Sequence, residues 1–289
     1  MSGEVAYLNG EWLPLAQAKV SVLDRGFLFA DGVYEVVPVY AGRSFRLAEH
    51  LRRLARSLAE LRIHDPHTAA QWTALVERLV AENSPGAGNG NLLVYLQVTR
   101  GAPAKRGHPF PENTPPTVLG LCHALPAPPE SARRDGVAAM TMPDIRWHRC
   151  DIKSIALLPN ILATQSARET DCNEAILHRD GRVTEGASSN VFAVIGDRIV
   201  TPPLGTDILP GVTRDLLIEL HRRANARVHE EPIALDAVRN AAEIWLTSAT
   251  REVLPVTRLD GRPIGSGKPG PRWQEAYRQF QSYKASLAA

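Results

Sequence analysis

The chain has 289 residues, of which 44% are hydrophobic and 22% are charged, and its formal net charge is +2 at pH 7. This length accommodates two domains with ordinary hydrophobic cores, and the near balance of charge argues against nucleic-acid and anionic-membrane partners. Three unevenly spaced cysteines argue against a disulfide framework and a metal site, and without a leader-type or membrane-length apolar run we expect a cytoplasmic protein.

Residues 1–125 alternate between strand-like and helical patterns, which predicts an N-terminal α+β domain. Period-two alternation predicts strands, and apolar residues at intervals of three and four predict helices. The strand patterns fall in residues 5–15, 32–47, 92–100 and 116–125, and the helical spacing falls in residues 48–61 and 69–83.

Residues 126–136 contain several prolines and show no apolar period, so we interpret them as a linker. The remainder, residues 137–289, is expected to form a C-terminal α/β domain that carries Lys153. Predicted strands lie in residues 137–142, 174–186 and 189–203, predicted helices in 157–170 and 211–224, and strands over 243–264 close the pattern.

Lys153 is conspicuous because arginine carries nearly all of the positive charge, and this lysine precedes a long apolar run. Desolvation of an amine favours its neutral form, and a neutral amine is what Schiff-base chemistry requires. The competing interpretation is a lysine at a helix start that pairs with Asp151.

Glu185 lies between a predicted strand and the small polar run Gly186–Asn190, which would let backbone approach a ligand closely. Its carboxylate could face a buried positive nitrogen, or it could simply occupy a turn. Downstream, Gly211, Val212 and Thr213 open a helix, and free N–H groups at such an end bind anions. Alternatively, Thr213 is only the N-cap of that helix.

Two further features could each bind an anion, the first a phosphate and the second a carboxylate. The hydroxyl-rich turn at residues 247–250 could share a phosphate with the helix start, and Arg53 could supply the counter-charge, unless it lies on a solvated helix face. Arg106 and His108 are two residues apart in an extended segment, so both side chains can converge on one carboxylate. The alternative for this pair is an ordinary polar loop.

Together these stretches resemble the class IV (fold-type IV) pyridoxal-phosphate aminotransferases over nearly the whole chain, from about Tyr7 to the last strands. The Arg-x-His pair narrows the resemblance to the D-amino-acid branch. The matching motifs are DRGFLFADGVYEVV, EHLRRL, LQVTRG, RGHPFPENT, DIRWHRCDIKS, EAILHRDGRVTEGASSNVF and ILPGVTRD.

The resemblance implies a role for each matching residue. Lys153 would hold pyridoxal 5'-phosphate as a Schiff base and carry the proton, and Glu185 would pair with the pyridine nitrogen. The phosphate would be bound by Arg53, Val212 and Thr213, and the substrate carboxylate by Tyr34, Arg106 and His108. Ala249 stands where relatives often carry a hydroxyl residue, so that phosphate contact would come from its backbone N–H, from Ser248 or from Thr250.

The implied fold class is α/β (α+β), a two-domain fold-type IV architecture with the cofactor at the domain interface, expected as a homodimer. The implied reaction is a ping-pong transamination between a D-amino acid such as D-alanine and a 2-oxo acid such as 2-oxoglutarate. Alternatives are a branched-chain L-amino-acid aminotransferase, an (R)-amine transaminase and a 4-amino-4-deoxychorismate lyase. A cofactor-free binding protein is disfavoured because Lys153 and Glu185 are both present.

Overall fold

The computed structural model describes residues 4–84 and 90–287, which form two compact units of mixed helix and sheet. Unit 1 contains the chain up to Ala127, the segment Ile152–Ala156 and Leu287; unit 2 contains Pro128–Asp151 and Leu157–Ser286. The change of unit therefore falls inside the expected linker. Lys153, however, belongs to unit 1, whereas we expected it in the C-terminal domain.

Unit 1 is built on an antiparallel sheet with the order β2-β1-β6-β5-β3-β4. Its strands are β1 (Val5–Leu8), β2 (Glu11–Pro14), β3 (Gly32–Tyr40), β4 (Arg43–Ser44), β5 (Leu92–Thr99) and β6 (Thr117–Ala124). Its helices are η1 (Leu15–Gln17), α1 (Arg25–Phe29), α2 (Leu47–Glu60) and α3 (Ala69–Asn83). The alternation and spacing in the sequence predicted these strands and the two long helices, and the short η1 and α1 are additions.

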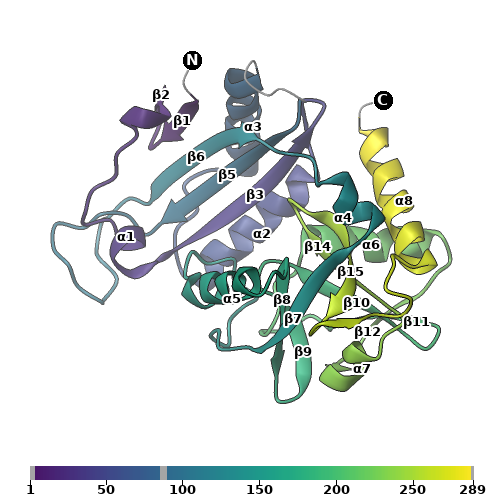
Figure 1. Ribbon diagram of the computed structural model, residues 1–289. Helices are drawn as coiled ribbons and strands as arrows, with labels where there is room; N and C mark the ends of the chain where they lie inside the picture. Colours follow the sequence, from purple (N-terminus) through teal and green to yellow (C-terminus); the bar gives the residue numbers. More distant parts are fainter. Residues whose placement is uncertain (1–3, 85–89, 288–289) are drawn as a thin grey trace. The chain divides into compact units, whose positions relative to one another are not determined.

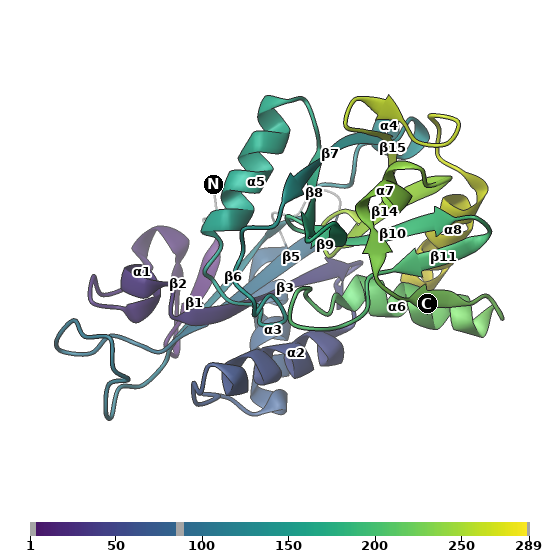
Figure 2. The ribbon, with the colours of Figure 1, turned by 90° about the horizontal axis from the view of Figure 1, so that it is seen from below.

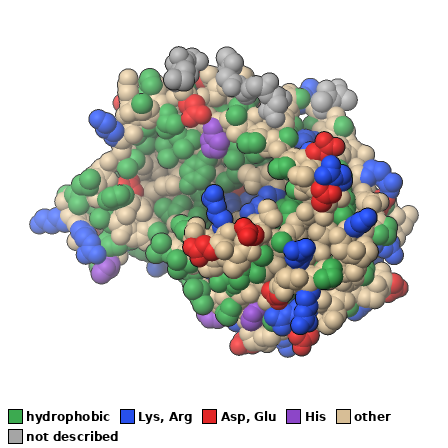
Figure 3. All heavy atoms as spheres, in the orientation of Figure 1, with side chains coloured by type: hydrophobic (Ala, Val, Ile, Leu, Met, Phe, Trp, Pro, Cys, Tyr) green, Lys and Arg blue, Asp and Glu red, His purple; other side chains and the backbone are tan. Residues whose placement is uncertain are grey.

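Helices α2 and α3 cover one face of this sheet, as Figure 1 shows. Leu54 and Leu58 of α2 and Val76 and Leu79 of α3 are buried in the core of unit 1, as expected for apolar residues that recur on one helical face. The opposite face stays half-exposed, and in Figure 3 hydrophobic side chains gather over β5 and β6.

The Lys153 segment joins unit 1 by pairing with β3. The Tyr34 N–H donates to the Lys153 carbonyl (3.0 Å), and the Ile155 N–H donates to the Gly32 carbonyl (3.1 Å). Gly32 is required here because a Cβ at this position would lie 2.6 Å from the Val98 carbonyl oxygen. The segment shows no periodicity in the sequence, and its place is set by these long-range hydrogen bonds.

Unit 2 contains a larger mixed sheet with the order β12-β11-β10-β14-β15-β7-β8-β9-β13, and β16 pairs with β15. Its strands are β7 (Val137–Pro143), β8 (Glu174–Arg179), β9 (Arg182–Gly186), β10 (Asn190–Ile195), β11 (Arg198–Thr201), β12 (Val228–Glu230), β13 (Ile233–Ala234), β14 (Glu243–Ser248), β15 (Glu252–Leu259) and β16 (Arg262–Pro263). Its helices are α4 (Glu130–Arg134), α5 (Leu158–Glu169), α6 (Val212–Arg223), α7 (Leu235–Arg239) and α8 (Pro271–Ser286).

Helices α6 and α8 pack against each other and against β14, and α5 packs on β7 and β8 (Figure 2). Helix α8 differs from our expectation that strands would close the pattern. It forms because Trp273, Ala276 and Phe280 share one face and are all buried, and Trp273 donates to the Val253 carbonyl. No helix within residues 4–84 and 90–287 is long and apolar enough to cross a membrane.

Candidate active site

The backbone of Lys153 is fixed on both sides while its amine is left without a hydrogen bond among the described residues. Its N–H donates to the Ser57 hydroxyl at 3.2 Å, and its carbonyl accepts from Tyr34. The Nζ atom lies 4.1 Å from the centroid of the Tyr34 ring. Asp151, the partner considered in the sequence, accepts instead from Arg149 at 3.0 Å. The arrangement presents a half-buried amine that is available for chemistry.

Arg53 is held by a buried carboxylate. Its Nε and Nη2 atoms donate to the two oxygens of Glu35 at 2.7 and 2.9 Å, and Nδ1 of His50 lies 2.8 Å from the same carboxylate. Burial would raise the pKa of Glu35, but Arg53 and His50 outweigh it and hold this pKa well below its ordinary value. The neighbouring Arg52 is exposed, so the solvated-face interpretation applies to Arg52 and is wrong for Arg53.

Tyr34 packs against a second tyrosine on the same sheet face. The ring centroids of Tyr34 and Tyr95 are 5.7 Å apart, and the Tyr95 hydroxyl donates to Gln97 at 2.6 Å. Burial and the adjacent Tyr34 raise the pKa of Tyr95 to about 12, so Tyr95 remains a neutral hydrogen-bond donor beside Tyr34.

Arg106 and His108 lie together but not with Tyr34. Both contact Phe29 of α1: the Arg106 guanidinium carbon is 4.8 Å from the ring centroid, and the His108 ring is 5.3 Å from it. Within residues 4–84 and 90–287, no hydrogen bond or ring contact joins either residue to Tyr34. Arg106 and His108 thus share the Phe29 ring as a neighbour, and both are exposed.

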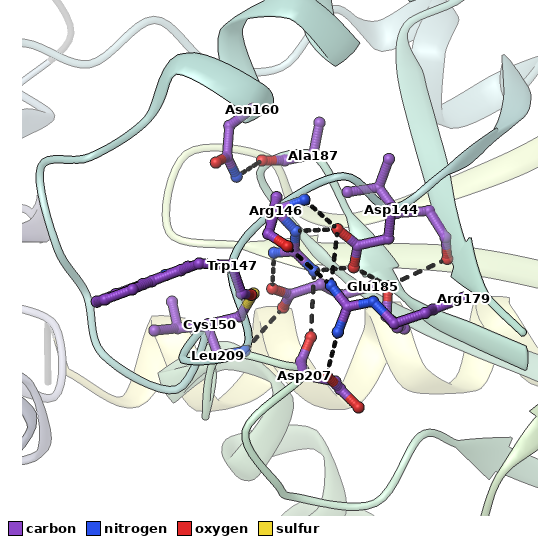
Figure 4. A network of polar contacts seen from close by, with 12 residues as sticks. Asp144, Arg146, Trp147, Cys150, Asn160, Arg179, Glu185, Ala187, Asp207 and Leu209 are labelled. Atoms are coloured by element: carbon purple, nitrogen blue, oxygen red, sulfur yellow. Dashed lines mark hydrogen bonds and ion pairs between the residues drawn. The ribbon is translucent and has the colours of Figure 1, made fainter.

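Glu185 is buried at the centre of a polar network in unit 2 (Figure 4). One carboxylate oxygen accepts a short hydrogen bond from Arg146, and the other accepts from the Asn190 amide and the Leu209 N–H, both at 3.0 Å. Arg146 is itself fixed by Asp144 through contacts of 2.9 and 2.8 Å. Burial raises the pKa of Glu185 to about 7, although Arg146 opposes this shift.

The first N–H groups of helix α6 receive no side-chain cap, so they are available to bind an anion. Its N-cap is Gly211, without a side-chain cap, so the interpretation of Thr213 as the N-cap is wrong. Val212 and Thr213 are both buried. A Cβ on Gly211 would lie 2.0 Å from Oδ1 of Asn190, so only glycine lets the helix start approach the Glu185 network this closely.

The end of β14 supplies further hydroxyl groups. Thr247 pairs with Asn190 across β10 and β14, and its buried hydroxyl has no hydrogen-bond partner in the described part of the chain. Ser248 accepts from the Arg251 N–H at 3.2 Å and closes the turn. Because buried polar atoms are normally paired, the orphaned Thr247 hydroxyl fits a site that is completed by a ligand.

Comparison with known proteins gives this geometry a context. A model of the family "Amino-transferase class IV" matches residues 32–259. The chain is 42% identical over 274 residues to a D-alanine aminotransferase of Bacillus licheniformis, covering 95% of both chains. It is 38% identical to a D-alanine aminotransferase of Staphylococcus aureus (strain MSSA476), covering 97% of this chain and 98% of the relative. This chain belongs to the class IV aminotransferases.

A solved structure supports the same fold for this class IV aminotransferase. A T.th. branched-chain amino acid aminotransferase with pyridoxamine 5'-phosphate matches with a TM-score of 0.88 and 26% identity, covering 99% of this chain and 94% of that chain. The mixed α/β fold class that the sequence predicted is therefore confirmed.

Each unit of this class IV aminotransferase contains group types that a phosphorylated pyridine cofactor requires. Unit 1 offers the unbonded amine of Lys153 and the fixed guanidinium of Arg53. Unit 2 offers the buried carboxylate of Glu185, the uncapped start of α6 and the orphaned hydroxyl of Thr247. These are the group types that an aldehyde, a phosphate and a pyridine nitrogen require.

Our sequence reasoning missed the residues that support these groups. Glu35 and His50 fix Arg53, and Arg146 and Asn190 fix Glu185. One signal was available, since Glu35 is a carboxylate inside an apolar strand and a buried charge needs a partner. No local pattern marks Arg146, because its partner Glu185 is distant in the sequence.

Proposed function

We infer that this class IV aminotransferase transfers the amino group of a D-amino acid such as D-alanine to a 2-oxo acid such as 2-oxoglutarate. The observation that carries this function is the 42% identity to a D-alanine aminotransferase over 95% of both chains. The retention of Lys153, Glu185 and the Arg106–His108 pair supports it. The branched-chain alternative is supported by fold similarity at 26% identity, which is weaker.

The cofactor is pyridoxal 5'-phosphate. Lys153 would hold its aldehyde carbon and Glu185 its pyridine nitrogen. Arg53, Val212 and Thr213, with a group from Ser248, Ala249 or Thr250, would bind the phosphate. When bound, this cofactor supplies an electron sink for the pair left when a proton leaves the substrate Cα. The two oxygens of Glu35 already orient the Arg53 guanidinium before the phosphate binds. Little side-chain entropy of Arg53 is therefore lost on binding.

Lys153 and the carboxylate-binding residues determine which enantiomer of the substrate loses its Cα proton. The Lys153 Nζ atom takes the proton from the substrate Cα and later returns it. Tyr34, Arg106 and His108 would bind the α-carboxylate and fix the orientation of the substrate. Because Lys153 acts from one side, only the D-enantiomer presents its Cα–H to the amine. Glu185 favours a protonated ring nitrogen electrostatically.

We also propose that the enzyme is a cytoplasmic homodimer. Leu158, Ile161 and Leu162 of α5 are 74%, 58% and 59% exposed, and an apolar surface of this kind is typical of a protein interface. The cysteines within residues 4–84 and 90–287 are free, which is consistent with a reducing compartment.

A donor panel tests the proposed reaction. The purified holoenzyme is assayed with D-alanine, L-leucine and an (R)-arylamine, each with 2-oxoglutarate, and we expect D-alanine to have the largest kcat/KM. Preference for L-leucine would favour a branched-chain enzyme, and preference for the arylamine an (R)-amine transaminase. Production of pyruvate from 4-amino-4-deoxychorismate would favour the lyase.

The Arg106→Ala variant tests the carboxylate assignment. A charge-assisted hydrogen bond contributes roughly 1.5–3 kcal/mol, so kcat/KM for D-alanine should fall about tenfold or more. Lys105→Ala, which changes the adjacent exposed cation, serves as the control. Wild-type kinetics of Arg106→Ala with D-alanine would refute the assignment.

A further inference from the structure

The exposed pair Arg106 and His108 sits on a loop that the sheet itself does not hold. Residues 102–115 connect β5 to β6 and extend beside α1 in both views (Figures 1 and 2). Just before these residues, the Arg25 N–H donates to the Gly101 carbonyl at 2.9 Å and the Arg100 N–H donates to the Asp31 carbonyl at 3.1 Å, but among the described residues no main-chain to main-chain hydrogen bond joins residues 102–115 themselves to another part of the chain. Beyond Gly101, the position of the loop therefore depends on side chains.

Asp31 is the centre of the side-chain contacts that reach this loop. It follows Ala30, the C-cap of α1, and accepts from the Nε of Arg25 at 2.7 Å. It also accepts from Nε and Nη2 of Arg100 at 2.8 and 2.9 Å. One carboxylate thus orients two guanidinium groups, and all three side chains are at most 13% exposed.

Arg25 extends this arrangement to the loop backbone. Its Nη1 donates to the Gly107 carbonyl at 2.5 Å, and its Nη2 donates to the His108 carbonyl at 3.1 Å. The guanidinium also lies 5.0 Å from the centroid of the Phe29 ring, on which Arg106 and His108 pack. Arg25 therefore holds the main chain at the two residues that follow Arg106.

Arg100 holds the far end of the same loop. Its guanidinium carbon lies 3.6 Å from the centroid of the Phe110 ring, and Arg62 lies 4.7 Å from that centroid. Two carbonyls, those of Leu61 and Arg62, accept from Arg100 at 2.8 and 3.0 Å. The loop is thus fastened at residues 107–108 and at residue 110, just after Arg106.

The charges make Asp31 the critical member of this clamp, which we define as Asp31, Arg25 and Arg100. Burial would raise the pKa of Asp31, but the hydrogen bonds from Arg100 and Arg25 keep it below its ordinary value. Asp31 therefore stays ionised across the working range of pH. Its neutralisation would leave two buried guanidinium groups without their common carboxylate, which is strongly unfavourable.

We propose that Asp31 is a positioning residue that acts through Arg25 and Arg100 to hold the 106–110 loop, and so sets the affinity of the enzyme for the substrate carboxylate. This inference rests on the proposed role of Arg106 and His108. It adds that their placement depends on a buried clamp that touches neither the substrate nor the cofactor.

The test uses the holoenzyme of Asp31→Asn, and of Phe110→Ala, which alters only a ring that is 48% exposed and so preserves the fold. The matched control is Asp260→Asn in unit 2, whose carboxylate accepts from Thr141 and Arg239 without contacting the loop. We measure KM and kcat for D-alanine, and the rate at which trypsin cuts after Lys105 and Arg106 in the folded protein.

For Asp31→Asn we expect KM to rise about tenfold, kcat to change much less, and trypsin to cut the loop several times faster. Phe110→Ala should also raise KM and the rate of trypsin cleavage. Asp260→Asn should change neither KM nor the cleavage rate. Added to Arg106→Ala, Asp31→Asn should raise KM by less than the product of the separate effects, because both act on one interaction.

Unchanged KM and unchanged cleavage in both Asp31→Asn and Phe110→Ala would overturn the clamp. A multiplicative effect in the double variant would also overturn it, because Asp31 would then act independently of Arg106. Failure of the proposed role of Arg106 would give a different result, because Arg106→Ala alone would then leave KM unchanged. Faster trypsin cleavage of Asp31→Asn would still show that the clamp holds the loop.

Discussion

Glu35 and Glu185 are both buried carboxylates, yet their surroundings shift their pKa values in opposite directions. Glu35 receives both nitrogens of Arg53 and the His50 ring, and its pKa is lowered. For Glu185 the effect of burial exceeds the opposing effects of Arg146 and the Leu209 N–H, and its pKa is raised to about 7. The first carboxylate thus serves as a permanent anion that orients an arginine. The second is poised to interact with a titratable nitrogen of a ligand.

The pH dependence of stability tests the state of Glu185 in the cofactor-free protein. Because the folded pKa of about 7 exceeds the ordinary 4.5, the folded state binds more protons between these values. Its contribution to stability is therefore complete below about pH 4.5 and is lost as the pH rises toward 7. Glu185→Gln cannot titrate, so it should lack a loss of roughly 2.5 kcal/mol between pH 5 and 8.

Denaturant midpoints of both cofactor-free proteins at pH 5 and pH 8 measure this difference. Other titrating groups contribute equally to the two proteins, so the comparison isolates Glu185. Parallel midpoints at the two pH values would show that Glu185 is ionised throughout.

Arg53 should depend on Glu35 for its orientation. Glu35→Gln removes the charge that faces Arg53, and breaking a buried ion pair in this way costs about 3–5 kcal/mol. We expect a lower urea midpoint and weaker binding of pyridoxal phosphate, measured by fluorescence titration. Arg52→Gln, which changes the exposed neighbour on α2, should do neither. A Glu35→Gln protein with a wild-type midpoint and affinity would contradict the pairing.

At the residue scale, the sequence indicates candidate groups for chemistry better than the groups that support them. Lys153 and Glu185 stand out by their neighbours in the chain, although this local pattern leaves a structural alternative open for each and their roles come from the family resemblance. Arg146 meets Glu185 only through folding, across 39 positions of the sequence. A hydrogen-bond partner that lies far away in the sequence cannot be recognised from the local pattern of residues.

Among the elements, the start of α6 depends on glycine at its N-cap. A Cβ on Gly211 would meet Oδ1 of Asn190 at 2.0 Å, and Asn190 donates to Glu185 and to the Leu209 carbonyl. Overpacking of this kind costs about 1–3 kcal/mol. Gly211→Ala should therefore displace Asn190 and weaken cofactor binding, which equilibrium dialysis of pyridoxal phosphate measures.

Gly205→Ala is the matched control for this element, because nothing lies within 4 Å of a Cβ at Gly205. It should bind the cofactor as the wild type does. Equal dialysis results for the two variants would show that Asn190 does not couple the helix start to Glu185.

Elements with a clear apolar period were predicted, and elements held by distant contacts were not. Helices α2 and α3 follow from leucine and valine spacing, and β10 and β14 from their apolar runs. The segment Ile152–Ala156 has no period and joins unit 1 through hydrogen bonds to β3. Helix α8 carries its buried Trp273, Ala276 and Phe280 in a mostly polar sequence, which conceals its amphipathic face.

For the whole molecule, two observations are consistent with the homodimer that we propose. Arg106 and His108, which we assign to the substrate carboxylate, pack on Phe29, and no contact joins them to Tyr34 within the described residues. Helix α5 buries only Ala163 and Ala167, while its large apolar residues stay exposed. A second copy of the chain would account for both, because it would cover α5 and could bring a carboxylate-binding loop to the site.

Leu162→Glu tests that assembly. Leu162 is 59% exposed, so a charge there costs the isolated chain little, but it would be desolvated in an interface between two copies. We expect the variant to sediment as a monomer and to lose activity with D-alanine, while retaining its far-UV circular dichroism. Leu15→Glu, at an exposed leucine of unit 1, controls for the added charge. A fully active Leu162→Glu monomer would mean that one chain completes its own site, and that the Arg106–His108 loop must then reach Tyr34 within the same copy.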